Sequence, residues 1–339
     1  MNTHLLRRSL LCTLLVLFFC FSAASQSTGI VVHGKFGGLI FGFDIDPNGT
    51  EGLLAEAVIN SDGTVHAAIE TFDQQTGQII RVVAQSQTRD DFVALGVVGN
   101  SVGLIEREHP VSLLKVQRTF HTLNPLNSNR LTSAWIPPVG QNHIVTEVRR
   151  DPGSDEIAVL ARDLSLNSVP FVFSSNVAAN TFSPVISITD NDFNFEEDPV
   201  IAWDSQNNQV ILGHHARSQF IVPPKIGFID LTTGTFSEFT GRGLGLINGM
   251  ALDSADRVLC TTTSFVPEVQ FYDLTTLTGS SQLLPGASDS LSRGQAVEFD
   301  PVNKLFLIAQ PFTSTGTTGS SIQVYDTTGH FLESIRIEL

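Results

Sequence analysis

The stretch Ile247–Gly279, INGMALDSADRVLCTTTSFVPEVQFYDLTTLTG, contains three short apolar segments separated by polar turns. We expect strands at Gly249–Leu252, Val258–Thr263 and Val269–Tyr272, the last two rich in β-branched or aromatic residues. The segments between them hold Asp, Ser, Thr and Gly, which favour reversal of the chain. The stretch therefore predicts a small antiparallel sheet.

The same phrase recurs along the chain, with its first turn at positions 46, 99, 151, 204, 253 and 300. Its second half, an apolar residue before a polar turn, recurs at a similar period, for example at Asp230, Asp273 and Asp326. Units of about 40–50 residues with four strands each are typical of β-propeller blades. We predict an all-β fold, a six-bladed β-propeller with four antiparallel strands per blade. The predicted blades span 38–85, 91–137, 143–188, 198–240, 246–286 and 294–339.

The first 26 residues are typical of a secretory signal peptide. Arg7 and Arg8 precede an apolar run from Leu10 to Phe21, and small residues up to Ala24 follow as a cleavage site. An uncleaved signal anchor is the alternative, although the run is short for a membrane span. We expect residues 1–26 to be a signal peptide, 27–339 to be one propeller domain, and the protein to be secreted or periplasmic.

Removing the leader changes the charge and the cysteine count. Loss of Arg7 and Arg8 leaves 17 basic against 34 acidic residues, a net charge of −17. A surface with this much negative charge repels nucleic acid and anionic lipid. We therefore expect no nucleic-acid partner and no membrane contact after signal removal. Cys260 alone remains, in an apolar strand, which predicts a buried thiol and excludes an intrachain disulfide.

The loops of a propeller usually carry its function, on the face where they converge over the central channel. We call this the loop face; it holds the connections between blades and those between second and third strands. Residues just before each first strand should ring the channel mouth: Lys35, Asp90, Asp91, Asn142, His143, Glu196, Glu197, Asp198, Asn248, Arg293 and Gln295. The low-complexity stretch Thr313–Ser321 is expected to be a loop.

One segment of this ring, Asp190–Asp198, is rich in carboxylate and amide oxygens, which hard divalent cations prefer as ligands. The alternative is a solvated acidic loop on an acidic protein. Asp44–Gly49 resembles the first half of a calcium loop, but Ala55 stands where the last ligand would be, so a plain turn is favoured. His143 is the candidate general base, with a structural histidine as its alternative.

The blade phrase resembles those of six-bladed propellers of the NHL, YVTN and gluconolactonase (regucalcin-like) groups, over essentially the whole mature chain. Glu197–Trp203 is similar to the segment with which the lactonase group supplies a metal-binding Glu, and Asn248–Ala251 to the one that supplies a metal-binding Asn. This resemblance implies a divalent cation, Ca²⁺ or Zn²⁺, on Glu197, Asp198 and Asn248. Ile247 and Asp198 depart from the family pattern, and Arg293-Gly294-Gln295 replaces the expected third ligand.

Two classes of function follow from the sequence. The first is an exported module, expected to be a monomer, that binds a protein, a glycan or a small ligand through its loop face. The alternative is a metal-dependent, lactonase-like hydrolase. Oxidation with a quinone or haem lacks an attachment motif in the sequence. We favour the binding module, because the match to the lactonase pattern fails at the third ligand.

Overall fold

The computed structural model of the chain is all-β. It describes residues 38–45, 51–59, 65–73, 79–85, 91–98, 101–108, 117–123, 131–132, 143–150, 156–163, 170–176, 181–188, 200–214, 222–263, 265–287, 293–310 and 321–336. Within them the strands form six antiparallel sheets, which we number in chain order.

The first three sheets pair consecutive strands. Sheet 1 holds β1 (Gly38–Ile45), β2 (Glu51–Ile59), β3 (Val65–Asp73) and β4 (Ile79–Gln85). Sheet 2 holds β5 (Asp91–Val98), β6 (Ser101–Glu108), β7 (Gln117–Leu123) and β8 (Leu131–Thr132). Sheet 3 holds β9 (His143–Arg150), β10 (Glu156–Asp163), β11 (Pro170–Asn176), β12 (Thr181–Phe182) and β13 (Ile186–Ser187).

The last three sheets repeat this order. Sheet 4 holds β14 (Val200–Asp204), β15 (Gln209–His214), β16 (Lys225–Asp230) and β17 (Phe236–Thr240), with the 3₁₀ turn η2 (Ser205–Asn207) after β14. Sheet 5 holds β18 (Ile247–Asp253), β19 (Val258–Thr263), β20 (Glu268–Asp273) and β21 (Thr278–Leu283). Sheet 6 holds β22 (Ala296–Asp300), β23 (Leu305–Gln310), β24 (Ser321–Asp326) and β25 (Phe331–Arg336).

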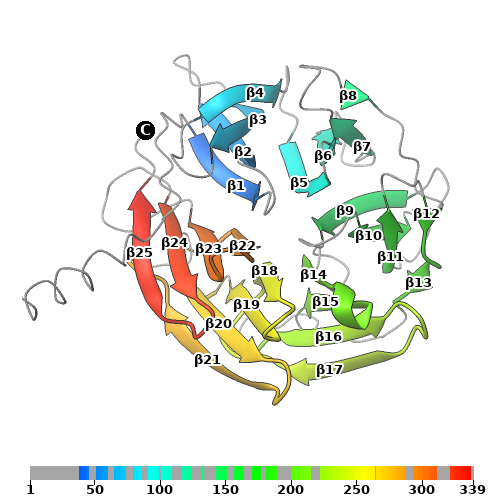
Figure 1. Cartoon of the computed structure of the whole chain (residues 1–339), viewed down its shortest axis with the longest axis vertical. Coiled ribbons are helices and arrows are strands. Elements are labelled where there is room, and N and C mark those ends of the chain that lie inside the picture. The colour runs from blue at the N-terminus through cyan, green and yellow to red at the C-terminus, as the bar shows by residue number, and fades with distance from the viewer. Residues whose placement is uncertain are drawn as a thin grey trace, which may run out of the picture.

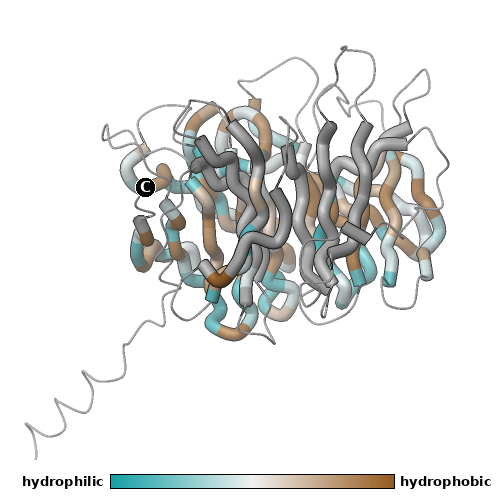
Figure 2. The backbone as a smooth tube through the Cα atoms, turned by 90° about the horizontal axis from the view of Figure 1, so that it is seen from above, coloured by the Kyte–Doolittle hydropathy of each residue, from teal (hydrophilic) through white to brown (hydrophobic). Residues whose placement is uncertain are grey.

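The sheets are arranged around a common centre, with the first strand of each sheet innermost (Figure 1). Neighbouring first strands contact one another in the order β1, β5, β9, β14, β18, β22, and β22 contacts β1 again. Seen edge-on, the strands run between two opposite faces (Figure 2). The fold is a β-propeller, and its inner strands lie at the beginning of the predicted blade ranges.

Sheet 3 departs from the predicted four strands. Its outer strand is split into β12 and β13, which pair with opposite ends of β11. Pro184 lies between the two pieces and has no backbone N–H for a ladder, so it interrupts the strand. The Ser183 N–H still donates to the Ser174 carbonyl (2.9 Å).

The turn after each first strand is held by the aspartate that marks the repeat. Asp253 Oδ1 accepts the N–H groups of Ala255 (3.1 Å) and Asp256 (3.3 Å), and Asp300 makes the equivalent bonds in sheet 6. Each turn ends in a left-handed residue, Arg257 (φ 58°) in sheet 5 and Lys304 (φ 57°) in sheet 6. Non-glycine residues other than Asn and Asp rarely adopt this conformation, so Arg257 and Lys304 call for a compensating interaction.

The turns between third and fourth strands differ in where their glycine lies. Gly234, which follows Asp230, takes the left-handed position of its turn (φ 72°), but in sheet 5 that position is Leu277 (φ 54°). Gly279, which matches Gly234 only by pattern, lies in β21, where a Cβ would approach Tyr272 Cδ1 to 2.6 Å. The two glycines therefore serve different purposes, backbone conformation and close packing.

The core lies between neighbouring sheets. One cluster joins sheets 3 and 4, another sheets 4 and 5, and a third sheets 5 and 6. Aromatic rings cross these boundaries, as in the contacts of Phe239 with Tyr272 (5.6 Å) and Phe271 with Phe306 (5.8 Å between ring centroids). Aromatic rings therefore contribute to the packing between neighbouring sheets.

Several sequence predictions fall outside the described residues, among them the leader 1–26 and most of Thr313–Ser321. The prediction of a loop is wrong for Ser321, which begins β24 and is buried. Its hydroxyl accepts a hydrogen bond from Gln323 Nε2 (2.9 Å). A helix long and apolar enough to cross a membrane does not occur among the described residues.

Candidate functional site

The strand order assigns the connections to two faces. Each first strand runs away from the loop face, so the turns after first and third strands lie on the opposite face, which we call the turn face. The loop face receives the β17–β18, β19–β20 and β21–β22 connections. The described residues therefore sample the loop face best around sheet 5.

Four of the six first strands have an irregularity in their pairing with the second strand. In β1, β5, β9 and β18 one extra residue interrupts the pairing with the second strand: Phe41, Val93, Thr146 and Asn248. Such β-bulges re-aim side chains and often occur beside binding sites. Asn248, predicted as a metal ligand, is therefore the bulged residue of sheet 5.

Asn248 lies where sheet 5 contacts the segment that leads into sheet 6. Its Nδ2 donates to the Gly294 carbonyl (3.2 Å), which also accepts from Thr262 Oγ1 (3.2 Å). The adjacent Gly249 packs directly on β22, where a Cβ would lie 2.9 Å from the Val297 nitrogen. The Asn-Gly phrase thus has a structural reason, the close approach of β18 and β22.

The other predicted site residues are not brought together by the described part of the chain. Glu197 and Asp198 lie outside it, as does the rest of Asp190–Asp198. His143 begins β9, where its backbone pairs with Asp163, and its side chain is outside the description. Among the described residues, His, Cys, Asp and Glu side chains do not gather in groups of three suited to a metal. The cation on Glu197, Asp198 and Asn248 remains a prediction.

Exposed apolar side chains gather at the loop-face end of sheet 5. Phe265, in the β19–β20 loop, is 49% exposed, and Leu283, at the end of β21, is 60% exposed. Leu283 pairs with Glu268, and the next residue, Leu284, donates its N–H to the Pro267 carbonyl (2.9 Å). We call Arg242, Phe265, Glu268 and Leu283 the sheet 5 loop edge.

Buried polar groups hold this edge in place. Gln270 accepts a hydrogen bond from Thr261 Oγ1 (2.9 Å) and donates one to Thr263 Oγ1 (3.0 Å). Thr263 Oγ1 in turn donates to the Val266 carbonyl (3.0 Å), so the chain of bonds ends in the loop that carries Phe265. All of its side chains are buried, which makes each bond costly to break. These buried hydrogen bonds therefore hold the β19–β20 loop in place.

The β17–β18 connection is fixed beside it. The Arg242 N–H donates to the hydroxyl of Tyr272 (2.6 Å), a side chain of the next sheet. Burial raises the pKa of Tyr272, although the Arg242 backbone bond lowers it, so the hydroxyl stays protonated at neutral pH. Gly243 (φ 78°) passes so close to sheet 5 that a Cβ would lie 3.0 Å from Glu268 Oε2. This places the backbone of Arg242 and Gly243 next to Glu268 at the same edge.

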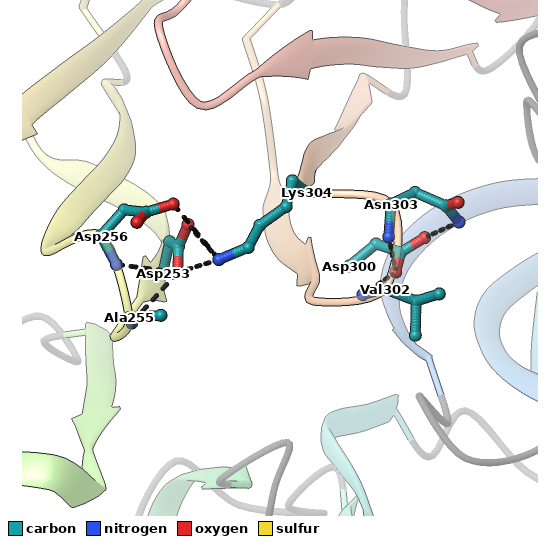
Figure 3. Close-up of polar contacts among 7 residues, drawn as sticks. All are labelled: Asp253, Ala255, Asp256, Asp300, Val302, Asn303 and Lys304. Carbon is teal, nitrogen blue, oxygen red and sulfur yellow. Dashed lines mark hydrogen bonds and ion pairs between the residues drawn. The ribbon is translucent and has the colours of Figure 1, made fainter.

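The turn face carries ion pairs that sequence reasoning did not predict. Lys304 Nζ lies 3.1 Å from both carboxylate oxygens of Asp253 and 3.2 Å from Asp256 Oδ2 (Figure 3). Arg257 Nη1 makes the equivalent pair with Asp204 of sheet 4. Desolvation lowers the pKa of Lys304, but its bonds to Asp253 and Asp256 outweigh this and raise it overall. We call these two pairs the turn-face latches.

The sequence contained a signal for the latches. Arg257 and Lys304 both stand four residues after the repeat aspartate, at the left-handed position of the turn. Each reaches the buried aspartate of the preceding sheet, Asp204 or Asp253. A basic residue at a constant offset in successive repeats indicates such a contact once the sheets are placed side by side.

Comparison with known proteins supports the fold alone. No family model matches the chain, and no curated protein matches its sequence. A chain in the crystal structure of a nidogen/laminin complex is similar with a TM-score of 0.55 and 13% identity, over 84% of this chain and 92% of that one. A chain of a mitotic checkpoint complex is similar with a TM-score of 0.52 and 11% identity, over 90% and 82% of the two chains. The protein has the β-propeller fold of these structures.

Proposed function

We propose that the mature chain is an exported β-propeller that binds a protein partner through its loop face. The proposal for export rests on the sequence of residues 1–26. We also propose that the six sheets are six blades of one ring, which the contacts of β22 with both β18 and β1 support. A ring presents a broad rigid surface with loops on it, and binding residues concentrate on such loops.

The observation that carries the binding face is the sheet 5 loop edge. Phe265 (49% exposed) and Leu283 (60% exposed) lie at one end of one sheet and stand beside Glu268 and Arg242. Aromatic residues, Phe among them, and Arg are enriched in protein interfaces, where a few residues carry most of the binding energy. The exposed apolar residues of the turn face, such as Leu277 and Val302, belong to different sheets.

The two similar structures named above also support a protein partner. Each is, by its title, a complex: one of nidogen with laminin, the other of the mitotic checkpoint. Propellers of this overall shape thus occur in protein assemblies. The acidic net charge of the mature chain favours a partner with a basic contact surface.

Site-specific photo-crosslinking in the native cell tests the proposal without knowing the partner. A photoreactive phenylalanine analogue replaces Phe265 or Leu283 on the loop face, and Leu277 or Val302 on the turn face as matched controls of similar exposure. We expect a discrete adduct of higher mass from the loop-face positions only. Adducts from the turn face alone, or from neither face, would refute the proposal.

A further inference from the structure

Three charged side chains of the inner strands meet in the channel. Arg149 of β9 donates from Nη1 to Glu298 Oε1 of β22 (2.5 Å) and from Nε to Glu147 Oε1 of its own strand (2.9 Å). The side chains of Arg149 and Glu298 are each only 17% exposed, and that of Glu147 is 11% exposed. An ion pair this well shielded is screened far less than a surface pair.

The pair joins sheets that are not neighbours. Around the ring, β14 and β18 separate β9 from β22 on one side, and β5 and β1 separate them on the other. Arg149 stands two residues before position 151, and Glu298 two residues before Asp300, so they occupy equivalent places in opposite sheets. The bond therefore crosses the central channel.

The same group also binds the backbone of a third sheet. The Ile201 N–H donates to Glu147 Oε2 (2.7 Å), and the Ile201 carbonyl accepts from Arg149 Nε (3.2 Å). Ile201 lies on β14, an inner strand whose free edge faces the channel. Side chains of sheet 3 thus bind the backbone at this edge and connect it to Glu298 across the ring.

We propose that Arg149 and Glu298 form a strut that holds opposite sheets together and closes the channel below the loop face. In sheet 5 the position equivalent to Arg149 is 251, two residues before Asp253. Asn248, at the channel mouth, comes three residues earlier, so the strut lies about 10 Å further along the strand. The ring is then stabilised through its centre as well as by contacts between neighbours.

Hydrogen exchange distinguishes a strut from a local contact. In Arg149→Met we expect amide exchange to rise about tenfold in β14 and also in β22, which belongs to the opposite sheet. In Glu298→Gln the rise should appear in β9, at a distance from the altered residue. Lys225→Met, which removes a pair with Glu238 within sheet 4, is the control and should change exchange in sheet 4 only.

A thermal double-mutant cycle gives a second readout. Each single variant should lower Tm by about 5 °C, and the double variant by little more than the worse single. Additive losses in Tm, or faster exchange confined to the mutated sheet, would overturn the strut. If Arg149→Met does not fold, Arg149→Lys and Glu298→Gln still test the same coupling, because each keeps a side chain of similar length.

Discussion

Lys304 Nζ lies at equal distances, 3.1 Å, from the two carboxylate oxygens of Asp253, an aspartate that is 1% exposed and belongs to the preceding sheet. The lysine backbone is left-handed, a conformation that costs a non-glycine residue roughly 1–2 kcal/mol. A glycine at this position would avoid that cost but would leave Asp253 without its cation. The latch explains why strain is retained in successive turns.

Removing the latch should lower stability. In Lys304→Met we expect a loss of about 1–2 kcal/mol, because Asp253 stays buried without its counter-ion while the exposed lysine end reduces the effect. Urea unfolding of the mature chain measures it. Lys225→Met breaks a pair with Glu238 in which both side chains are 24% exposed, so no charge is left fully buried, and the loss should be less than about 0.5 kcal/mol. Equal losses in the two variants would show that the turn-face latch has no special role.

Cys260 should be chemically inert in the folded protein. Its side chain is fully buried, and burial raises its pKa well above the usual value, so the reactive thiolate is scarce. For the mature chain without residues 1–26, we expect no labelling by iodoacetamide at pH 8 over hours, and one label per chain in guanidinium chloride. Rapid labelling of the native protein would contradict the packing between sheets 5 and 6.

The outer turns predict a loss of stability in acid. Backbone N–H groups of Thr233 and Thr232 lower the pKa of Asp230, and that of Thr275 lowers the pKa of Asp273. A carboxyl whose pKa is lower in the folded state stabilises the protein above its unfolded pKa, about 3.9. That contribution disappears as the pH falls through the folded pKa.

The measurement is Tm against pH for the mature chain and for Asp273→Asn. The aspartate protein should lose Tm more steeply between pH 4 and pH 2, because the asparagine variant has no carboxyl to protonate at that turn. Ser205→Asn, which introduces the same amide in the turn after β14 without removing a carboxyl, serves as the control. Parallel curves for Asp273→Asn and the unchanged chain would contradict the hydrogen-bond pattern of this turn.

The metal site predicted from the sequence can be tested directly. If Ca²⁺ or Zn²⁺ binds at Glu197, Asp198 and Asn248, a hundredfold excess over Kd should stabilise the protein by about 2.7 kcal/mol. The shift should vanish in Glu197→Ala and persist in Glu268→Ala, which removes a carboxylate from the sheet 5 loop edge. Absence of a thermal shift with either ion would leave Asp190–Asp198 as an acidic loop without a cation.

The sequence was informative about local structure and much less so about contacts between repeats. Asp253 and Asp300 could be identified as turn residues because their hydrogen bonds lie within three residues of them. The latch of Lys304 and the pair of Arg149 with Glu298 join residues 51 and 149 positions apart, so they become evident only when the ring is built. Asn248 was predicted as a metal ligand because of its side-chain oxygen. Its position on a bulge against β22 depends on backbone geometry that the sequence does not display.

The most direct test of the account is the affinity of the partner found by crosslinking for two paired variants. Phe265→Ala with Leu283→Ser alters the sheet 5 loop edge, and Leu277→Ser with Val302→Ser alters the turn face by a similar exposed area. We predict that the loop-face pair raises Kd at least tenfold, or about 1.4 kcal/mol, with Tm unchanged, and that the turn-face pair leaves Kd within twofold. An unchanged Kd in the loop-face pair, or a weakened one in the turn-face pair, would contradict binding through the loop face.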